Sequence, residues 1–327
     1  MNGRELALRL LVELAKYNRI QGSSGLEDAA ELIKDRLDEL GIPNEIIYYY
    51  YNREYDRFKA PIGWDLEYGE LEWGGRKVTT DDTPLLVVAH SPSGEARGVA
   101  VHVGDGEGSM MDVEGKIVIA RGDPYVVYRN AVGSGAAGLL LYRESAPGDA
   151  FPYMGLFLKE EERGIPVMSI PRELVDELAG NVVSMVVQSH FRPNAKMPVI
   201  IAGDDEAKVG VISHYCHPYE MYNDNLSGTV ANILVAKQAR AFHLFVPEYW
   251  GSFAYMLDRG GKMVQESFVN LDMVGENQGV TGSTLIQVNP PHFTMTPLEA
   301  FIYRSLRSVF TVDTFGGSGK VWGIRMD

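Results

Sequence analysis

The sequence predicts an α/β protein in which a mixed, mostly parallel sheet lies between helices and is interrupted by a smaller β-rich domain. Three strand–loop–helix units follow one another between residues 209 and 275, the pattern of parallel strands joined by helical crossovers. Two helices and a strand are expected before them, in the first 51 residues. From about residue 56 short apolar pieces alternate with turn residues, which is typical of a β-rich insert.

The N-terminal elements show regular helical and strand patterns. Apolar residues recur near helical spacing over residues 3–17. A second helix is expected from Ser24, because Ser24 and Glu27 have the form of a capping box, and Gly41 supplies the expected helix end. Residues 42–51 are rich in Ile and Tyr and predict a strand. These elements are the expected beginning of the α/β domain.

The insert has a recognisable central part. The segments VEGKIVIARG, YRNAVGSGAAGLLLY and GIPVMSIPRELVDEL, in this order, predict a buried strand, a helix with a Gly/Ala-rich strand, and a third strand followed by a short helix. This succession resembles the protease-associated domain, a small domain without catalytic residues that is found within or beside peptidases. The resemblance implies a role in shaping access to a neighbouring site. The expected domains are therefore residues 1–55 with 190–327, and the insert at 56–189.

Composition restricts the class of partner. The 327 residues carry 30 basic and 44 acidic side chains, giving a net charge of −14 and a pI of about 5.0. Long-range attraction to nucleic acid or to an anionic membrane needs a positive surface, so neither partner is expected. The acidic excess suits a soluble cytosolic protein or one that attracts cations.

Targeting and redox features are also informative. Cys216 is the single cysteine, so no internal disulfide is expected. The first helix has charged residues spread among apolar ones, unlike a signal peptide. No apolar run approaches the roughly 18–20 residues that a membrane span needs. The predicted location is cytoplasmic.

Side chains that could bind a metal follow three of the predicted strands. His214, His217 and Asp224 lie in SHYCHP…NDNLSG, while Glu248 and Asp272 each follow a later apolar strand. Since parallel strands joined by right-handed crossovers end at the same sheet edge, these side chains should converge. Zinc at a catalytic site commonly takes three protein ligands plus water. The candidate ligands are His214 or His217 with Asp224 and Asp272, and Glu248 is the candidate general base.

The motifs SHYCHP…NDNLSG, PEYWGS and NLDMVG resemble those of the cocatalytic zinc aminopeptidase and carboxypeptidase family, which includes bacterial leucine aminopeptidases and glutamate carboxypeptidase. The likeness is greatest to a subgroup with HxCHP…NDNLSG and covers the chain outside the insert. It implies the zinc-exopeptidase fold, a zinc cofactor and short peptide substrates. It also implies roles for single residues: Asp224 as metal bridge, Asp272 as terminal ligand, Glu248 as general base, and His214 as ligand with His217 as its rival.

The sequence departs from the family pattern at the second metal. Tyr249 stands where the family has a second Glu. At the first ligand, where the family has His-x-Asp, Cys216 stands in place of the Asp. Gly319 and Lys320 replace the Asp and His of a usual Ser-Asp-His. The chain ends at Asp327, before the last strand and helix of such domains, so an incomplete C-terminus is expected. One Zn2+ is therefore expected rather than two, in a truncated chain, a one-metal variant or an enzyme that a partner completes.

Simpler explanations compete with the metal site. Asp224 and Asp272 could serve only as helix N-caps, although capping would not explain two histidines beside Asp224. Cys216 could pack as a small apolar side chain or bind metal. The remaining histidines have no ligand spacing and are expected at the surface or in satisfied core positions: His90, His102, His190, His243 and His292.

Three functional hypotheses remain. The first is a zinc-dependent exopeptidase, specifically an aminopeptidase for short peptides. The second is a catalytically weakened peptidase-like binding or assembly protein, suggested by Tyr249 and by Lys320. The third is another zinc-dependent amide reaction, such as deacylation. The sequence is compatible with a homo-oligomer and leaves the side-chain preference open.

Overall fold

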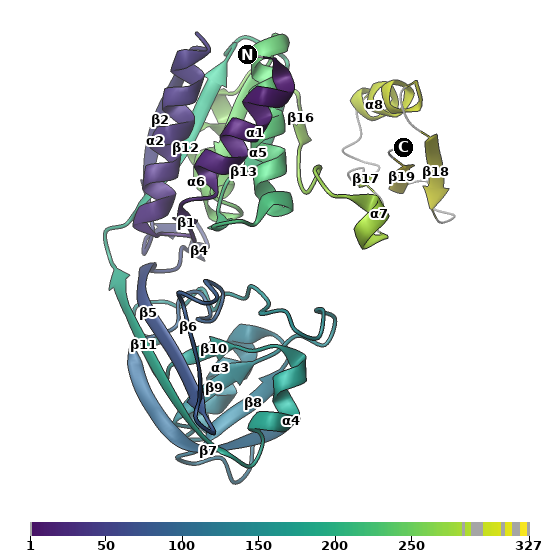
Figure 1. Cartoon of the computed structure of the whole chain (residues 1–327). Helices are drawn as coiled ribbons and strands as arrows, with labels where there is room; N and C mark the ends of the chain where they lie inside the picture. The colour runs from purple at the N-terminus through teal and green to yellow at the C-terminus, as the bar shows by residue number, and fades with distance from the viewer. Residues whose placement is uncertain (1, 283–284, 289–296, 309–310, 316–320, 326–327) are drawn as a thin grey trace. The chain divides into compact units, whose positions relative to one another are not determined.

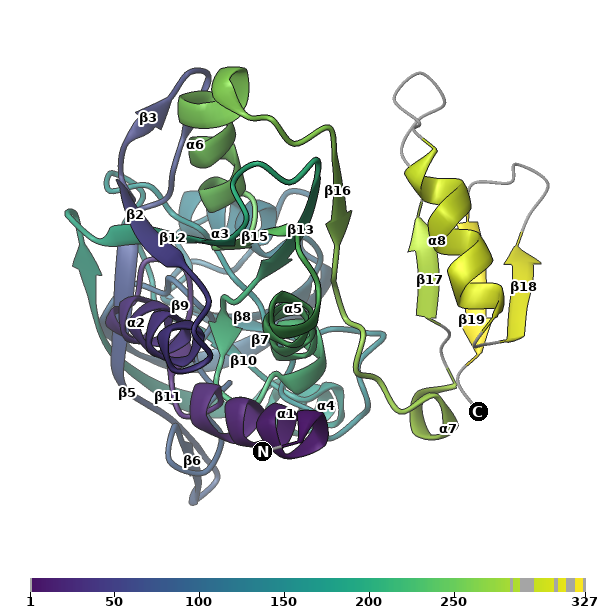
Figure 2. The ribbon, with the colours of Figure 1, turned by 90° about the horizontal axis from the view of Figure 1, so that it is seen from above.

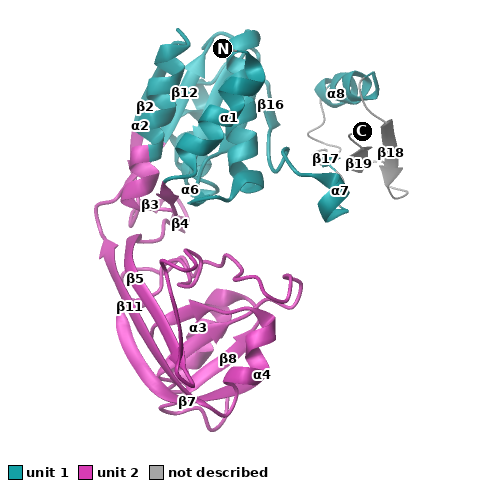
Figure 3. Ribbon diagram, in the orientation of Figure 1, with its two compact units in different colours: residues 1–16, 29–47, 199–327 teal, residues 17–28, 48–198 magenta. Residues whose placement is uncertain are grey.

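A computed structural model describes residues 2–282, 285–288, 297–308, 311–315 and 321–325. The chain forms two compact units (Figure 3): unit 1 is residues 1–16, 29–47 and 199–327, and unit 2 is residues 17–28 and 48–198. The insert expected at 56–189 lies within unit 2. None of the helices in the described ranges is long and apolar enough to cross a membrane.

Unit 1 contains a five-stranded sheet. In order across the sheet, the strands are β16 (Ser267–Asn270), β13 (Val209–His214), β15 (Phe242–Val246), β12 (Lys196–Gly203) and β2 (Asn44–Tyr50). Strand β13 is parallel to β15 and β16, whereas β12 is antiparallel to β15. The carboxyl ends of β13, β15 and β16 therefore lie at one sheet edge, as the sequence predicted.

Helices cover both faces of this sheet. They are α1 (Gly3–Leu14), most of α2 (Ser24–Glu39), α5 (Gly228–Gln238) and α6 (Trp250–Arg259). Figure 2 shows α6 on one face and α1, α2 and α5 on the other (Figure 1 gives the side view). In α1, Leu6, Leu10 and Leu14 are buried at intervals of one turn, which explains the helical pattern seen in the sequence.

The start of α2 differs from the prediction. The Ser23 hydroxyl oxygen accepts the N–H of Leu26 at 3.0 Å, so Ser23 rather than Ser24 fills the capping role. Glu27 accepts a hydrogen bond from Arg192 Nη2 at 2.8 Å. The capping box expected from Ser24 and Glu27 was wrong, because the neighbouring serine caps the helix and a distant arginine pairs with the glutamate.

The chain after β16 forms further short elements. These are α7 (Gln278–Thr281), β17 (Leu285–Val288), α8 (Leu298–Arg307), β18 (Thr311–Phe315) and β19 (Val321–Arg325). Strand β19 pairs antiparallel with both β17 and β18. Gly319 and Lys320, which the sequence places at the second-metal position, lie outside the described residues.

Unit 2 is built on a seven-stranded sheet. In order, its strands are β10 (Val167–Ser169), β9 (Gly138–Leu141), β8 (Ile117–Arg121), β7 (Gly94–Asp105), β11 (Val182–Arg192), β5 (Gly63–Trp73) and β6 (Arg76–Thr79). Strands β7 to β10 are parallel neighbours, and the other pairs are antiparallel. The shorter elements are β1 (Asn18–Arg19), β3 (Glu54–Tyr55), β4 (Phe58–Lys59), α3 (Pro124–Gly133), η1 (Arg172–Leu174) and α4 (Val175–Leu178).

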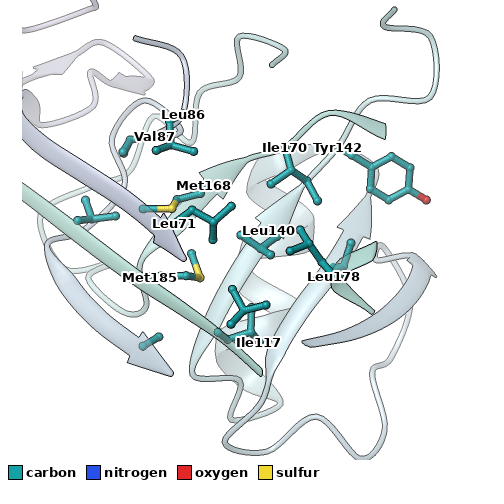
Figure 4. Packing of buried hydrophobic residues seen from close by; sticks show 14 of the residues in the cluster. Leu71, Leu86, Val87, Ile117, Leu140, Tyr142, Met168, Ile170, Leu178 and Met185 are labelled. Atoms are coloured by element: carbon teal, nitrogen blue, oxygen red, sulfur yellow. The ribbon is translucent and has the colours of Figure 1, made fainter. Parts of the chain in front are cut away.

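Both faces of the parallel strands β8, β9 and β10 in unit 2 are buried. Ile117, Ile119 and Leu140 belong to one apolar cluster, which also contains residues of β5 and β11 (Figure 4). The alternate residues Val118 and Leu139 belong to a second cluster, together with residues of α3. This two-sided burial explains why these strands are continuous apolar runs rather than alternating patterns.

Candidate metal centre

Three loops of unit 1 bring the predicted site residues together. His214 ends β13 and is followed by β14 (His217–Pro218) and a kinked turn, η2 (Tyr222–Ser227), that contains Asp224. Glu248 and Asp272 each lie two residues beyond a strand, β15 and β16 respectively. All five predicted site residues thus lie at or beyond the carboxyl ends of three adjacent strands.

The side chains form two overlapping groups of possible ligands. His214, Asp224 and Asp272 make one group, and His214, Cys216, His217 and Glu248 make the other; within each, one ligand atom per residue lies within 4.8 Å of the others. His214 is common to both groups.

Short distances connect both histidines to the carboxylates. His214 Nε2 lies 3.5 Å from Asp224 Oδ1 and 3.4 Å from Asp272 Oδ1. His217 Nδ1 lies 3.4 Å from the same Asp224 oxygen, and His217 Nε2 lies 3.6 Å from Glu248 Oε2. The structure therefore places His217 in the cluster beside His214.

Side chains of NDNLSG hold the Asp272 loop in place. Asn225 is fully buried; its Oδ1 accepts the N–H of Met273 at 3.0 Å and its Nδ2 donates to Leu271 O at 3.0 Å. Ser227 Oγ accepts the N–H of Val274 at 3.0 Å. These polar residues fix the distance between Asp224 and Asp272. The sequence interpretation missed their role, although the Asn residues on both sides of Asp224 were a visible signal.

The helix-capping explanation for Asp224 does not fit the geometry. Ser227 is the residue that precedes α5, and the N–H of Gly228 donates to Asn225 Oδ1 at 3.0 Å. The amide of Asn225 thus occupies the capping position, while the Asp224 carboxylate faces the two histidines.

Cys216 lies behind the histidines. It is 1% exposed, and its Sγ is 3.6 Å from His214 Nδ1. The same Sγ accepts the backbone N–H of Glu248 at 3.2 Å. Thr229 Oγ1 of α5 donates to the carbonyl of His214 at 2.9 Å. Polar contacts to the Glu248 loop and to helix α5 thus support the site from its buried side.

The charges of the site perturb one another. Burial raises the pKa of Asp224 and of Glu248, and the nearby carboxylates add to both shifts, while His214 opposes them. The hydrogen bond to His214 lowers the pKa of Asp272. Burial disfavours the charged form of His214, but Asp272, Cys216 and Glu248 together raise its pKa to about 11. Three carboxylates at close range therefore favour a cation among them.

The donor set fits a zinc ion. Imidazole nitrogens and carboxylate oxygens are the ligands that zinc takes at catalytic sites, usually three from the protein with one position open. Each of the two groups supplies at least three such atoms close together. One side of the cluster is buried, with His214 at 5% and His217 at 9% exposure, and the carboxylates lie towards solvent. This arrangement suits a metal that a substrate can reach.

Comparison with known proteins agrees with the resemblance seen in the sequence. Residues 83–178 match the family model of the PA domain, which confirms the predicted protease-associated domain. No curated protein shows significant sequence similarity to the chain.

Solved structures share the fold at low sequence identity. A Clostridium acetobutylicum protein assigned as a peptidase has a TM-score of 0.64 and 17% identity over 93% of this chain. This chain spans 63% of the length of that protein. BSAP, a zinc aminopeptidase from Bacillus subtilis, has a TM-score of 0.56 and 18% identity, covering 93% of this chain and 76% of BSAP. An aminopeptidase from Aneurinibacillus sp. strain AM-1 has a TM-score of 0.51 and 17% identity, covering 85% and 71% of the two chains.

These likenesses concern the fold. The protein has a mixed α/β, zinc-aminopeptidase-like fold together with a PA domain, as predicted. At 17–18% identity they do not assign an activity to individual residues of this chain.

Proposed function

We propose that the protein is a zinc-dependent exopeptidase, specifically an aminopeptidase that hydrolyses short peptides. The observation that carries the proposal is the convergence of His214, Asp224 and Asp272 with Glu248 at one sheet edge. The zinc-aminopeptidase-like fold supports it. His214, Asp224 and Asp272 would hold the ion, with His217 as the alternative or additional nitrogen ligand.

The roles of the side chains follow from their chemistry. Zinc, when bound, supplies Lewis acidity that polarises a scissile carbonyl and makes water more acidic. Glu248 has a carboxylate whose raised pKa brings its basicity closer to that of a general base at neutral pH. It would take a proton from the attacking water and deliver that proton to the leaving amine. The carbon–oxygen bond would form first, as water adds to the carbonyl carbon, and the carbon–nitrogen bond would break as the amine receives the proton.

We further propose one zinc ion per chain. His214 belongs to both ligand groups, so the two groups compete for the same imidazole. Beside Glu248 the chain has the phenol of Tyr249 rather than a second carboxylate. Zinc content of the purified protein, measured by elemental analysis, should be near one per chain. A value near two would replace this with a two-metal mechanism.

The direct test is the variant Glu248→Gln. It removes the base while keeping the shape of the side chain, so hydrolysis of aminoacyl p-nitroanilides should fall by roughly 10²–10⁴-fold with zinc content unchanged. Glu266→Gln is the matched control, since Glu266 is an exposed carboxylate that pairs with Lys208 at 3.4 Å. Equal activity in both variants would contradict the assigned base.

A second function is favoured by one observation. Tyr249 occupies a place beside the base where a second metal-binding carboxylate would complete a two-metal site. A protein that binds peptides without cleaving them would show peptide affinity, no turnover, and no change in Glu248→Gln. Calorimetry with short peptides, alongside the activity assay, separates the two functions.

A further inference from the structure

Tyr249 lies in an unusual turn beside the proposed base. Its φ of 56° and ψ of −70° are accompanied by a 2.6 Å hydrogen bond from the N–H of Trp250 to the carbonyl of Glu248. This is a γ-turn with positive φ at its centre, the rarer and more strained of the two γ-turn forms. A bulky residue in this conformation is a true outlier, and such outliers gather at functional sites.

The surrounding contacts hold the turn in this form. On one side, the N–H of Glu248 donates to Cys216 Sγ at 3.2 Å. On the other, the N–H of Gly251 donates to Pro247 O at 3.1 Å, and a Cβ at Gly251 would come within 2.5 Å of the proline ring. The N–H of Phe253 donates to Tyr249 O at 2.9 Å. The turn is thus fixed at both ends, and Tyr249 has little freedom to relax.

The phenol stands at the solvent side of the carboxylates. Tyr249 is 65% exposed, whereas His214 and Cys216, behind the cluster, are 5% and 1% exposed. The side chains of Tyr249 and Glu248 are hydrogen-bonded to each other, which places the phenol beside the base. A phenol carries its proton at neutral pH. A molecule reaching the cluster from solvent therefore arrives on the side where a protonated phenol stands.

We propose that Tyr249 is a catalytic residue. When a substrate and the attacking water reach Glu248, the Tyr249 hydroxyl turns from that carboxylate and donates its hydrogen bond to the oxygen of the scissile carbonyl as negative charge develops there. This inference rests on the proposed function. The phenol keeps its proton throughout, since the proton of the water passes through Glu248 to the leaving amine. A fixed donor aimed at a developing oxyanion stabilises the transition state more than the substrate. The strained turn then serves to hold that donor beside the base.

The test compares Tyr249→Phe with Tyr222→Phe. Tyr222 is also exposed, at 42%, and lies two residues before Asp224, so it controls for loss of a nearby phenol. Tyr249→Phe should lower kcat by roughly 10²–10³-fold, as loss of one oxyanion donor does, with KM nearly unchanged. It should weaken binding of an aminophosphinic dipeptide, a tetrahedral analogue, by a similar factor. Tyr222→Phe should do neither.

Zinc affinity and fold provide independent readouts. Chelator competition should give the same zinc affinity for Tyr249→Phe and the unchanged protein; a weaker affinity would make Tyr249 a metal ligand and overturn the inference. Tyr249→Gly removes the phenol and suits positive φ, so it should lose the same activity while melting at an equal or higher temperature. Unchanged kcat and analogue binding in both variants would also overturn it. If the unchanged protein binds no zinc and cleaves nothing, it is the proposed function that fails.

Discussion

In both units, parallel strands end at one edge of a sheet. The side chains at these two edges differ in charge and in the ligands they offer. In unit 1 the edge carries three carboxylates that lie close to two histidines. In unit 2 the edge borders a cavity of about 580 Å³, where Arg121 and Arg172 both pair with Glu144, at 3.3 and 3.8 Å. His102 and Tyr142 contact each other there at 3.0 Å.

This difference shows what makes a strand edge a reactive site. Topology provides the edge in both units, but in unit 2 opposite charges neutralise one another in partly exposed pairs. In unit 1 like charges are held together, partly buried, by the backbone contacts of Asn225 and Cys216. A bound cation would therefore strongly stabilise the carboxylate cluster of unit 1, but not the paired charges of unit 2. The chemistry therefore resides in the donor set rather than in the shared topology.

The largest expected effect comes from His214→Ala. Because His214 belongs to both ligand groups, its loss should reduce zinc affinity by well over the roughly 10–100-fold that an outer-shell change costs. His102→Ala removes the corresponding histidine at the edge of unit 2 and should leave zinc affinity unchanged. Chelator competition on both purified variants measures this. An unchanged zinc affinity in His214→Ala would mean that the protein binds zinc elsewhere.

A core substitution in unit 2 should separate stability from the metal site. Leu140 is fully buried in the cluster shown in Figure 4, and Leu140→Ala should cost about 2–5 kcal/mol of unfolding free energy. Hydrogen exchange of the amides in β8 and β9 should increase accordingly, while zinc affinity stays the same. Leu8→Ala, at a position 55% exposed in α1, is the control and should change little. A loss of zinc binding in Leu140→Ala would show that the site depends on unit 2.

Acid should weaken unit 2 through His90. Burial lowers the pKa of His90 to about 4, below its ordinary 6.5, so the unfolded chain takes up a proton first as the pH falls. The stability due to neutral His90 is present above pH 6.5 and declines towards pH 4, by up to about 3 kcal/mol. His90→Asn should flatten this decline, since Asn does not titrate and tolerates the φ of 65° found there.

The readout for His90 is the urea midpoint at pH 7 and at pH 4.5. The control is His190→Asn, because His190 is a histidine of the same unit whose side chain is 54% exposed. Because this control keeps His90, it should keep the acid loss that His90 causes. If His90→Asn retained the full acid loss, other groups would have to account for it.

The strand-end carboxylates could be placed from the sequence because the reasons are local and topological. Apolar runs mark β13, β15 and β16, and parallel crossovers require Asp224, Glu248 and Asp272 to meet. The γ-turn at Tyr249 and the clamp by Asn225 could not be placed, since both depend on partners from distant loops. The ligand roles, the single zinc ion, the cytoplasmic location and a homo-oligomer stay predictions.

The smallest expected effect concerns the charged pairs at the edge of unit 2. Glu144→Gln removes the carboxylate shared by Arg121 and Arg172, whose side chains are 45% and 49% exposed. Exposed ion pairs contribute about 0–1 kcal/mol and are screened by salt, so the urea midpoint should fall only slightly and the difference should vanish in 1 M salt. Glu27→Gln is the contrasting variant, because Glu27 and Arg192 pair at 2.8 Å and are only 21% and 24% exposed. In Glu27→Gln the urea midpoint should fall further, and the fall should depend less on salt. This result would show that burial, rather than the number of charges, decides how strongly an ion pair stabilises this protein. A large loss in Glu144→Gln would instead make that edge a structural element of unit 2 and weaken the contrast with unit 1.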